Sequence, residues 1–285
     1  MLPTAGVAQL LAPDDETCEQ LRRRFGLDPF HIKDMRNRQH PPACTRSGET
    51  LHLLLRIPAD GGEIDGELDL TSLSLLCDPR LCVLVWPTES VRRFDDELFA
   101  GMAPLDCVVL IAHLLLDPLL HRVYALREIM DEAEDRALAD VERADLASLL
   151  TMRREIAHLA RAAQANAEAL ESAIELGNLY SNLRMQDALE QMRRAQTLAE
   201  SKAEHALLVM QAVQSLLGQK LNRIMKFLAV VTFILSLLAV IAGIFGMNFS
   251  HMPVLQAENA FMLTLLGMAL LAVVLGLIFR FKRWW

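Results

Sequence analysis

The sequence has few cysteines and no Cys-x-x-Cys pair. The five that it contains, an odd number, are Cys18, Cys44, Cys77, Cys82 and Cys107. This usage argues against a disulfide framework and against a structural zinc site, and it favours free thiols in a reducing compartment. The N-terminus also lacks a basic segment before an apolar core, so we do not expect a secretory signal peptide.

Motifs typical of enzymes and of nucleotide-driven pumps are missing as well. The sequence has no P-loop, no Gly-x-Ser-x-Gly and no His-Glu-x-x-His. We therefore predict that the chain is not an enzyme, uses no cofactor and is not driven by ATP. Its formal net charge is -8, with the acids mainly before residue 205, which argues against nucleic acid as a partner.

Glycine and proline are scarce in the middle of the chain. No glycine lies between residues 102 and 177, and the only prolines there are Pro104 and Pro118. Apolar residues recur at three- and four-residue spacing, which predicts amphipathic helices. The charged residues of the first helix, Glu134 among them, are interpreted as a solvated face. The expected helices span residues 105–139, residues 145–176, and a stretch from residue 178 into a long apolar run.

The first 100 residues mix strand and helix patterns. Acids at Asp14 to Glu16 favour a helix start, Gly26 favours its end, and Pro41-Pro42 terminates a second helix. We predict helices at residues 17–25, 28–37 and 90–100, strands at residues 50–57, 68–77 and 81–86, and a turn at residues 58–66. This alternation predicts an α/β domain.

Two long uncharged runs lie near the C-terminus. Residues 227–245 and 260–279 are each long enough to cross the roughly 30 Å hydrocarbon core of a bilayer as a helix. Basic residues flank the pair on its outer sides, whereas the loop between the runs has none. Because basic residues stay on the cytoplasmic side, we expect both termini in the cytoplasm and the loop outside. The flanking residues are Lys220, Arg223, Lys226, Arg280, Lys282 and Arg283.

The third long helix is expected to continue into the first apolar run. It would then hold about 70 residues and measure roughly 100 Å at the usual rise of an α-helix. A lone helix of that length cannot bury its apolar side, so it needs partners. The sequence by itself leaves open whether these are other copies in an oligomer or helices of the same chain.

The tripeptide Gly246-Met247-Asn248 stands at the end of the first apolar run, with Met252-Pro253 in the loop behind it. Together with the basic, aromatic end at residues 281–285, this arrangement resembles the CorA family of divalent-cation channels. Residues 25–36 and the strand near residue 51 resemble the cytosolic domain that opens these proteins. The resemblance implies a homopentameric funnel in the inner (plasma) membrane.

Small and polar residues form one stripe along the first apolar run. At about 100° per residue, five positions fall within about 60° of Met225: Leu228, Thr232, Ser236, Ala239 and Gly243. Polar or small residues inside a span face a protein interior or a water-filled path rather than lipid. Helix packing through small residues is one interpretation. Pore lining is favoured because the stripe leads to Asn248.

Asn248 is the main candidate for ion selection. Mg²⁺ retains several of its waters, and a ring of amide oxygens accepts hydrogen bonds from that hydration shell without trapping the ion. In the family this asparagine forms the selectivity ring, with Gly246 allowing a tight turn and Met247 packing against it. The alternative for Asn248 is a helix C-cap, since asparagine tolerates left-handed geometry.

Further site residues follow only from the resemblance. It implies a hydrophobic constriction at Met225 and Leu228, with a pore-facing asparagine at Asn222. It also aligns Asp187, one turn before Glu190, with an acidic residue of a regulatory metal site in some relatives. A solvated helix face is the alternative for this acidic pair.

The transported ion stays open between two branches of the family. The full Gly-Met-Asn tripeptide favours Mg²⁺, with Co²⁺ or Ni²⁺ as further ions. The loop, however, has Ser250 and Val254 where magnesium-type relatives often carry acids, and His251 is a candidate ligand for transition metals. A ZntB-like Zn²⁺ transporter, with or without proton coupling, is therefore the alternative, and a membrane-anchored helical scaffold is a remote one.

The predicted organisation has six segments in chain order. A cytosolic α/β domain is followed by a helical domain with a stalk, a pore-lining span, an external loop, a second span and a basic cytosolic tail. Their bounds are residues 1–102, 103–226, 227–247, 248–259, 260–280 and 281–285.

Overall fold

The computed structural model describes the chain except for residues 1–2, 4, 65–66, 89–93, 248–258 and 283–285. It divides into two compact units, Met1–Met210 and Gln211–Trp285. One continuous helix, α5 (Leu183–Phe245), begins in the first unit and ends in the second.

A five-stranded mixed sheet forms the centre of the first unit. Its order is β1-β5-β4-β3-β2, with β1 parallel to β5 and the other neighbours antiparallel. The strands are β1 (Gly6–Leu11), β2 (Ala43–Ser47), β3 (Thr50–Ile64), β4 (Glu67–Cys77) and β5 (Leu81–Trp86). β5 is buried on both faces, which is why its sequence is a continuous apolar run.

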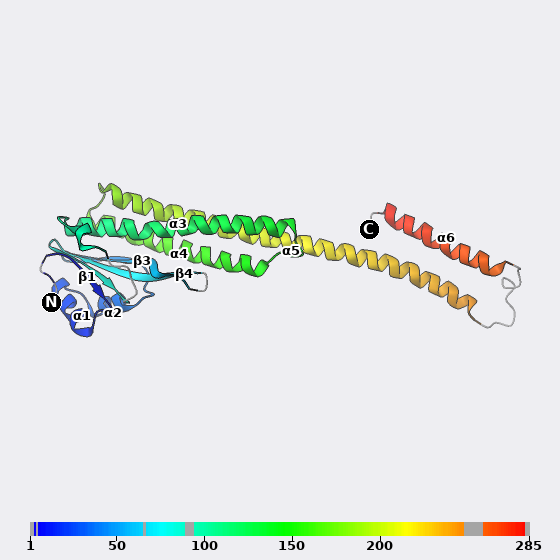
Figure 1. Ribbon diagram of the computed structural model, residues 1–285, viewed down its shortest axis with the longest axis horizontal. Helices are drawn as coiled ribbons and strands as arrows, with labels where there is room; N and C mark the ends of the chain where they lie inside the picture. The colour runs from blue at the N-terminus through cyan, green and yellow to red at the C-terminus, as the bar shows by residue number, and fades with distance from the viewer. Residues whose placement is uncertain (1–2, 4, 65–66, 89–93, 248–258, 283–285) are drawn as a thin grey trace. The chain divides into compact units, whose positions relative to one another are not determined.

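Helices cover both faces of this sheet (Figure 1). On one face lie α1 (Asp15–Phe25) and α2 (Pro29–Arg36), which bury Leu21 and Met35 against strand residues such as Val83. On the other face lie α3 (Pro104–Ala139) and α4 (Leu146–Gly177), which close the larger core. The predicted α/β domain is therefore a three-layer arrangement.

Local capping fixes where the two short helices begin and end. The Asp14 carboxylate accepts a hydrogen bond from the Thr17 amide, and Gly26 ends α1 with φ 62°. At α2, Asp28 and His31 form a capping box around Pro29. These are the signals that made both helices predictable.

An asparagine of α4 makes the hydrogen bonds to β3 at the point where the edge strand β2 no longer pairs with it. Pro41-Pro42 precedes β2, and proline has no amide hydrogen to continue the ladder along β3. Instead, the fully buried Asn166 accepts from the Arg56 amide at 2.8 Å and donates to the Arg56 carbonyl at 2.7 Å. α4 is thereby fixed to the sheet.

The structure confirms most predicted elements and corrects three. Part of the expected helix at residues 90–100 lies outside the described residues, namely residues 90–93. Over residues 94–100 the expectation is wrong, because only a 3₁₀ turn at Asp96–Phe99 forms there, capped by Asp95 and followed by Gly101 at φ 76°. The expected turn at residues 58–66 is largely strand, since β3 continues to Ile64 through an irregular register. β1 and β2 were not predicted.

The third correction concerns the start of α5. Residue 178 was expected to begin this helix, but Asn178 adopts φ 54° and ends α4 instead. Its amide donates to the Glu175 and Ile174 carbonyls, so it satisfies the end of the preceding helix. α5 begins five residues later, at Leu183.

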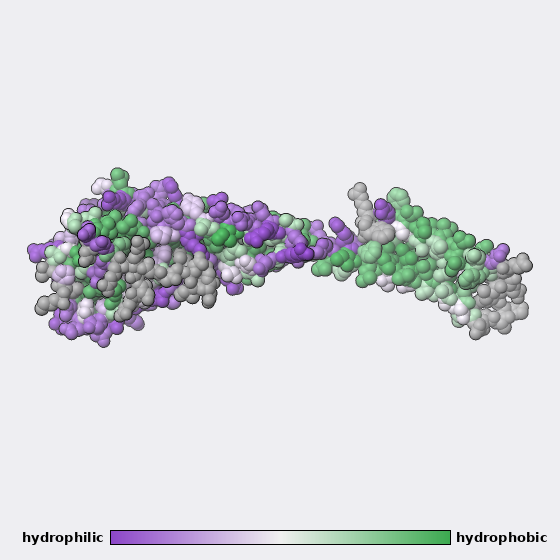
Figure 2. Space-filling view, viewed as in Figure 1, coloured by the Kyte–Doolittle hydropathy of each residue, from purple (hydrophilic) through white to green (hydrophobic). Residues whose placement is uncertain are grey.

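Three described helices are long and apolar enough to cross a membrane: α3, α5 and α6 (Ala260–Phe281). The apolar window of α3 is 39% buried within the chain, whereas those of α5 and α6 are only 6% and 0% buried. The apolar side of α3 therefore packs into the core of the first unit. Hydrophobic side chains cover α6 and the end of α5 (Figure 2), as expected for a pair of membrane spans.

Candidate functional site

One side of α5 packs against α6 within the second unit. Val230 is 3% exposed, and the half-buried positions on the same side are Ile234, Leu237, Leu238, Ile241 and Phe245. The rings of Phe233 and Phe279 meet edge to face with centroids 6.0 Å apart. Apolar contacts along a single side of α5 thus hold the hairpin together.

The predicted stripe lies on the opposite side of α5. Ile234, at the middle of the packed side, is about 180° from Met225 around the helix. Asn222 lies about 60° from Met225 and extends the stripe to seven positions. All seven are exposed in the single chain, with Met225 and Leu228 each 62% exposed. They are Asn222, Met225, Leu228, Thr232, Ser236, Ala239 and Gly243. Packing between the two helices of the hairpin therefore does not use this stripe.

The last turn of α5 is tightened at Gly246. Its amide donates to the Ala242 carbonyl at 2.9 Å and to the Gly243 carbonyl at 3.2 Å. A Cβ at residue 246 would lie 3.3 Å from the Ala242 oxygen, so crowding rather than a left-handed backbone favours glycine here. Met247 follows and is exposed. Asn248 lies outside the described residues.

A cavity of about 390 Å³ separates α5 from α6 near the end of the hairpin. Apolar side chains dominate its walls, and Gly267 and Ala260 leave room on the α6 side. The only side-chain hydroxyl among the lining residues, that of Thr264, donates to the Ala260 carbonyl at 2.8 Å. No charged side chain lines this hollow, and Asn259 supplies its one side-chain amide.

The acidic pair Asp187 and Glu190 does not converge on one point. Asp187 Oδ2 accepts from Gln191 at 3.0 Å and lies 3.5 Å from His113 Nδ1 on α3, whereas Glu190 pairs with Arg194. Among the described residues, no group of three or more histidine, cysteine, aspartate or glutamate side chains is arranged to hold a metal ion. A regulatory metal site at Asp187 would need ligands beyond this single chain.

A charged cluster with a buried centre at Lys202 and Glu134 joins α3 to α5 in the first unit. Lys202 Nζ lies 2.7 Å from Asp131 Oδ1 and 2.5 Å from Glu134 Oε2, and His205 Nδ1 lies 3.0 Å from the same Glu134 oxygen. The hydrogen bond from Lys202 lowers the pKa of Asp131. Glu134 is only 3% exposed, so its assignment to a solvated face was wrong.

Sequence reasoning missed this cluster, although a signal was present. Lys202 stands on the face of α5 that otherwise holds buried alanines such as Ala199 and Ala206. A lysine at a core position of a helix needs a buried carboxylate partner. The helical period identifies such a lysine, but only the fold shows that Glu134 is its partner.

Comparisons with known proteins agree on one family. The family model "CorA-like Mg2+ transporter protein" matches residues 8–283. The curated relative "Cobalt/magnesium transport protein CorA" of Methanocaldococcus jannaschii is 26% identical over 163 residues. That match covers 56% of this chain and 51% of the relative, so it spans about half of the relative's length.

Two solved structures share the fold. The complete CorA magnesium transporter from Methanocaldococcus jannaschii has a TM-score of 0.76 at 19% identity, covering 95% of this chain and 89% of that one. The ZntB cytoplasmic domain from Vibrio parahaemolyticus has a TM-score of 0.62 at 12% identity, and the match covers 77% of this chain and 93% of that one. The predicted fold, an α/β domain followed by long helices and two C-terminal apolar helices, is confirmed.

Proposed function

Because the chain belongs to the CorA-like Mg2+ transporter family, we propose that it moves divalent cations across a membrane. The inferred assembly is a homopentamer in the inner (plasma) membrane, and the inferred main cargo is Mg²⁺, with Co²⁺ or Ni²⁺ as further ions. Membership in a family of transporters also agrees with the prediction that the chain is not an enzyme.

The observation that carries this proposal is the exposed stripe on α5. α6 packs on the other side of α5, which leaves Thr232 and Ser236 uncovered in the single chain. Polar side chains inside a membrane span as a rule face a protein interior or a water-filled path rather than lipid. In a ring of identical chains the seven stripe residues would face the axis and line such a path.

Selection at the mouth of this path is assigned to Gly246, Met247 and Asn248. Gly246 tightens the end of α5, so Met247 would leave the helix at the same level in every copy. A ring of Asn248 amide oxygens would bind the waters of a hydrated Mg²⁺ ion and release it again, because no formal charge traps it.

The cytoplasmic end of the path would contain its constriction. Met225 and Leu228 are large, apolar and uncovered in the single chain, and a ring of such side chains closes a pore by dewetting. Asn222 lies one turn before them. Regulation by cytosolic metal through Asp187 and Glu190 would require another copy to complete the ligands, with the His113 imidazole 3.5 Å from Asp187.

The proposed topology places both termini in the cytoplasm. The basic residues before the first apolar run (Lys220, Arg223 and Lys226) and after the second (Arg280, Lys282 and Arg283) support this orientation. No nucleotide-binding motif is present, so flux would follow the electrochemical gradient. A divalent ion gains about 4.6 kcal/mol per 100 mV when it enters a negative interior, at ~2.3 kcal/mol per charge.

A Zn²⁺ transporter is the second candidate. Its support is the fold shared with the ZntB cytoplasmic domain and the loop between the spans, in which Glu258 is the only acid. A less acidic mouth concentrates all divalent cations less strongly, and the same loop contains His251, whose imidazole is a ligand that suits Zn²⁺. Proton coupling belongs to this candidate and not to the first.

Uptake into proteoliposomes tests the proposal. Mg²⁺ and Zn²⁺ are followed side by side with indicators, with and without a pH gradient, for the wild type and Asn248→Ala. We expect Mg²⁺ entry that is independent of pH and falls at least tenfold in Asn248→Ala. The control is Asn259→Ala, an exposed asparagine at the start of α6 whose side chain caps nothing, which should keep its flux.

Two other results would contradict the first proposal. Zn²⁺ entry driven by a proton gradient, with little Mg²⁺ flux, would assign the chain to the zinc candidate. No flux of either ion would leave the scaffold interpretation, provided that native mass spectrometry finds five copies of the 31.9 kDa chain in the same sample. A different copy number would refute the pentamer independently of the ion.

A further inference from the structure

Two cysteines stand opposite each other at the end of the β4–β5 hairpin. Cys77 is the last residue of β4, and its partner across the ladder is Cys82. The Asp78 amide donates to the Leu81 carbonyl at 2.9 Å, so Asp78 and Leu81 form a hydrogen-bonded pair. Because the two kinds of pair alternate along an antiparallel ladder, Cys77 and Cys82 form a non-hydrogen-bonded pair. In such pairs the Cα atoms are only about 4.5 Å apart and the side chains lie on the same face.

This separation suits a disulfide bond. Disulfides join residues whose Cα atoms are about 4.4–6.8 Å apart. Because Cys77 and Cys82 stand directly opposite each other, their side chains are neighbours on one face of the hairpin. The turn is held in place by Asp78, which accepts from the Arg80 and Leu81 amides and pairs with Arg24 at 2.7 Å.

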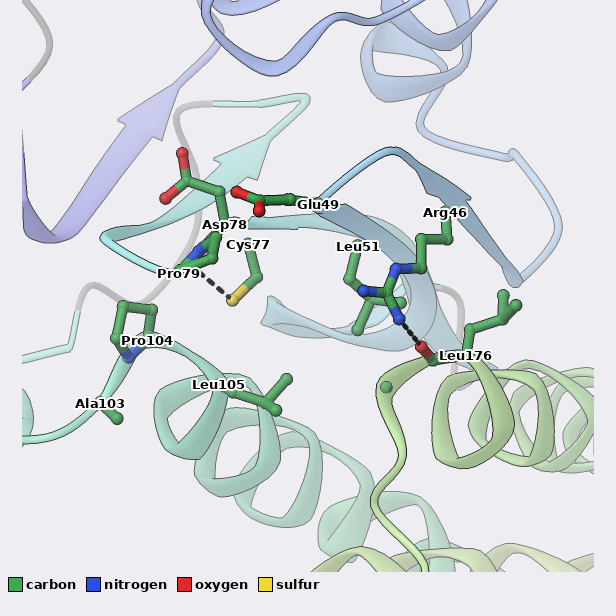
Figure 3. Close-up of a pocket in the computed structure, with 11 residues that line it drawn as sticks. Arg46, Glu49, Leu51, Cys77, Asp78, Pro79, Ala103, Pro104, Leu105 and Leu176 are labelled. Atoms are coloured by element: carbon green, nitrogen blue, oxygen red, sulfur yellow. Dashed lines mark hydrogen bonds between the residues drawn. The ribbon is translucent and has the colours of Figure 1, made fainter.

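One of the two sulfurs borders a cavity. A hollow of about 280 Å³ lies between this hairpin, the start of α3 and the end of α4, and Cys77 is one of its walls (Figure 3). The Cys77 thiol donates to the Asp78 carbonyl at 3.6 Å. Cys82 is fully buried and does not line this cavity. A small oxidant thus has a path to Cys77 and none to Cys82 through this opening.

We propose that Cys77 and Cys82 form a dithiol site that reacts with hydrogen peroxide. The Cys77 sulfur attacks one peroxide oxygen, the O–O bond breaks, and the proton of the Cys77 thiol passes to the leaving hydroxide, so that a sulfenic acid and water are the products. The Cys82 sulfur then attacks the Cys77 sulfur, the S–O bond breaks and a second water leaves. In total, two thiols are oxidised to one disulfide while one peroxide is reduced to two waters.

The surroundings of the two cysteines determine which sulfur reacts first. The hydrogen bond with Cys77 and burial raise the pKa of Cys82 well above its usual range. Cys82 therefore keeps its proton and acts second, after Cys77 has been oxidised. Cys107 lies in the first turns of α3 within the same core, and burial raises its pKa too. In a reducing compartment all three thiols stay reduced.

Peptide mapping of the full-length protein in detergent tests this site. After exposure to peroxide and alkylation of the remaining thiols, we expect the peptides that contain Cys77 and Cys82 to be linked and not alkylated at these residues. The linked product should be about 2 Da lighter than the same peptides with two free thiols. Cys77→Ala and Cys82→Ala should each abolish this product. The matched control is Cys44→Ala, which removes a more exposed thiol that has Leu53 rather than a cysteine across the ladder.

The remaining outcomes would overturn the proposal. They are a disulfide that includes Cys107, overoxidation of Cys77 to a sulfinic acid without a disulfide, and no reaction at doses that oxidise Cys44. If an alanine variant fails to fold, the wild type alone still tests the proposal. The identity of the linked peptides shows whether Cys77 has joined Cys82 or Cys107.

Discussion

At the scale of single residues, His52 makes the stability of the first unit sensitive to acid. This histidine of β3 is 3% exposed and lies 2.5 Å from the Ser74 hydroxyl. Burial, with smaller contributions from His31 and His40, lowers its pKa from 6.5 to about 3. Between these two pH values only the unfolded chain binds the proton, so stability is full above pH 6.5 and falls as the pH drops.

We therefore expect His52→Gln to flatten the pH dependence of unfolding. The wild type should lose up to about 1.4 kcal/mol per pH unit from this group between pH 6.5 and 3. The measurement is the midpoint of thermal unfolding in detergent across this range. His121→Gln, which changes an exposed histidine of α3, is the control and should keep the slope of the wild type. A slope that is equal in all three proteins would contradict the assignment.

At the scale of elements, the contact between α3 and α5 depends on one buried ammonium. Lys202 and Glu134 are 5% and 3% exposed, so removal of the lysine leaves a carboxylate buried without its charge partner. We expect Lys202→Met to lower the free energy of unfolding by about 3–5 kcal/mol. The double variant Lys202→Met/Glu134→Leu should regain most of this loss, because an apolar pair replaces the ion pair.

A double-mutant cycle in denaturant measures this coupling. The matched control is the ion pair of Glu190 and Arg194, which also lies on α5 but in which both side chains are exposed. Changing that pair should alter stability by no more than about 1 kcal/mol. If Lys202→Met cost as little as the exposed pair, the buried cluster would have no role in joining the two helices.

The elements also show what a sequence can reveal. β3 and β5 were predictable because their apolar runs and flanking turns are local signals. β1 was not, since it pairs in parallel with β5, some 75 residues away by the register of Gly6 with Leu81. The stripe on α5 followed from helical periodicity alone, whereas the side on which α6 packs required the fold. Lys202 and Glu134 are likewise far apart in sequence.

At the scale of the whole molecule, the exposed stripe predicts where copies of the chain approach each other. Large apolar side chains on α5, including Leu221 and Met225, are about 60% exposed in the single chain. Lipid can cover such side chains, whereas hydroxyls such as those of Thr232 and Ser236 as a rule face a protein interior or a water-filled path. If identical chains surround a path, a cysteine on the stripe will meet the same cysteine of a neighbouring copy.

We expect Ser236→Cys to form covalent dimers when membranes are oxidised with copper phenanthroline, in a background in which the five native cysteines are alanine. Ile234→Cys lies on the side packed against α6, and Leu270→Cys is exposed on α6, so both should remain monomeric on a denaturing gel. The second control matters because Leu270 is 66% exposed, so exposure alone does not explain a positive result. Dimers from Leu270→Cys but not from Ser236→Cys would place α6 between the copies and remove the stripe from the path.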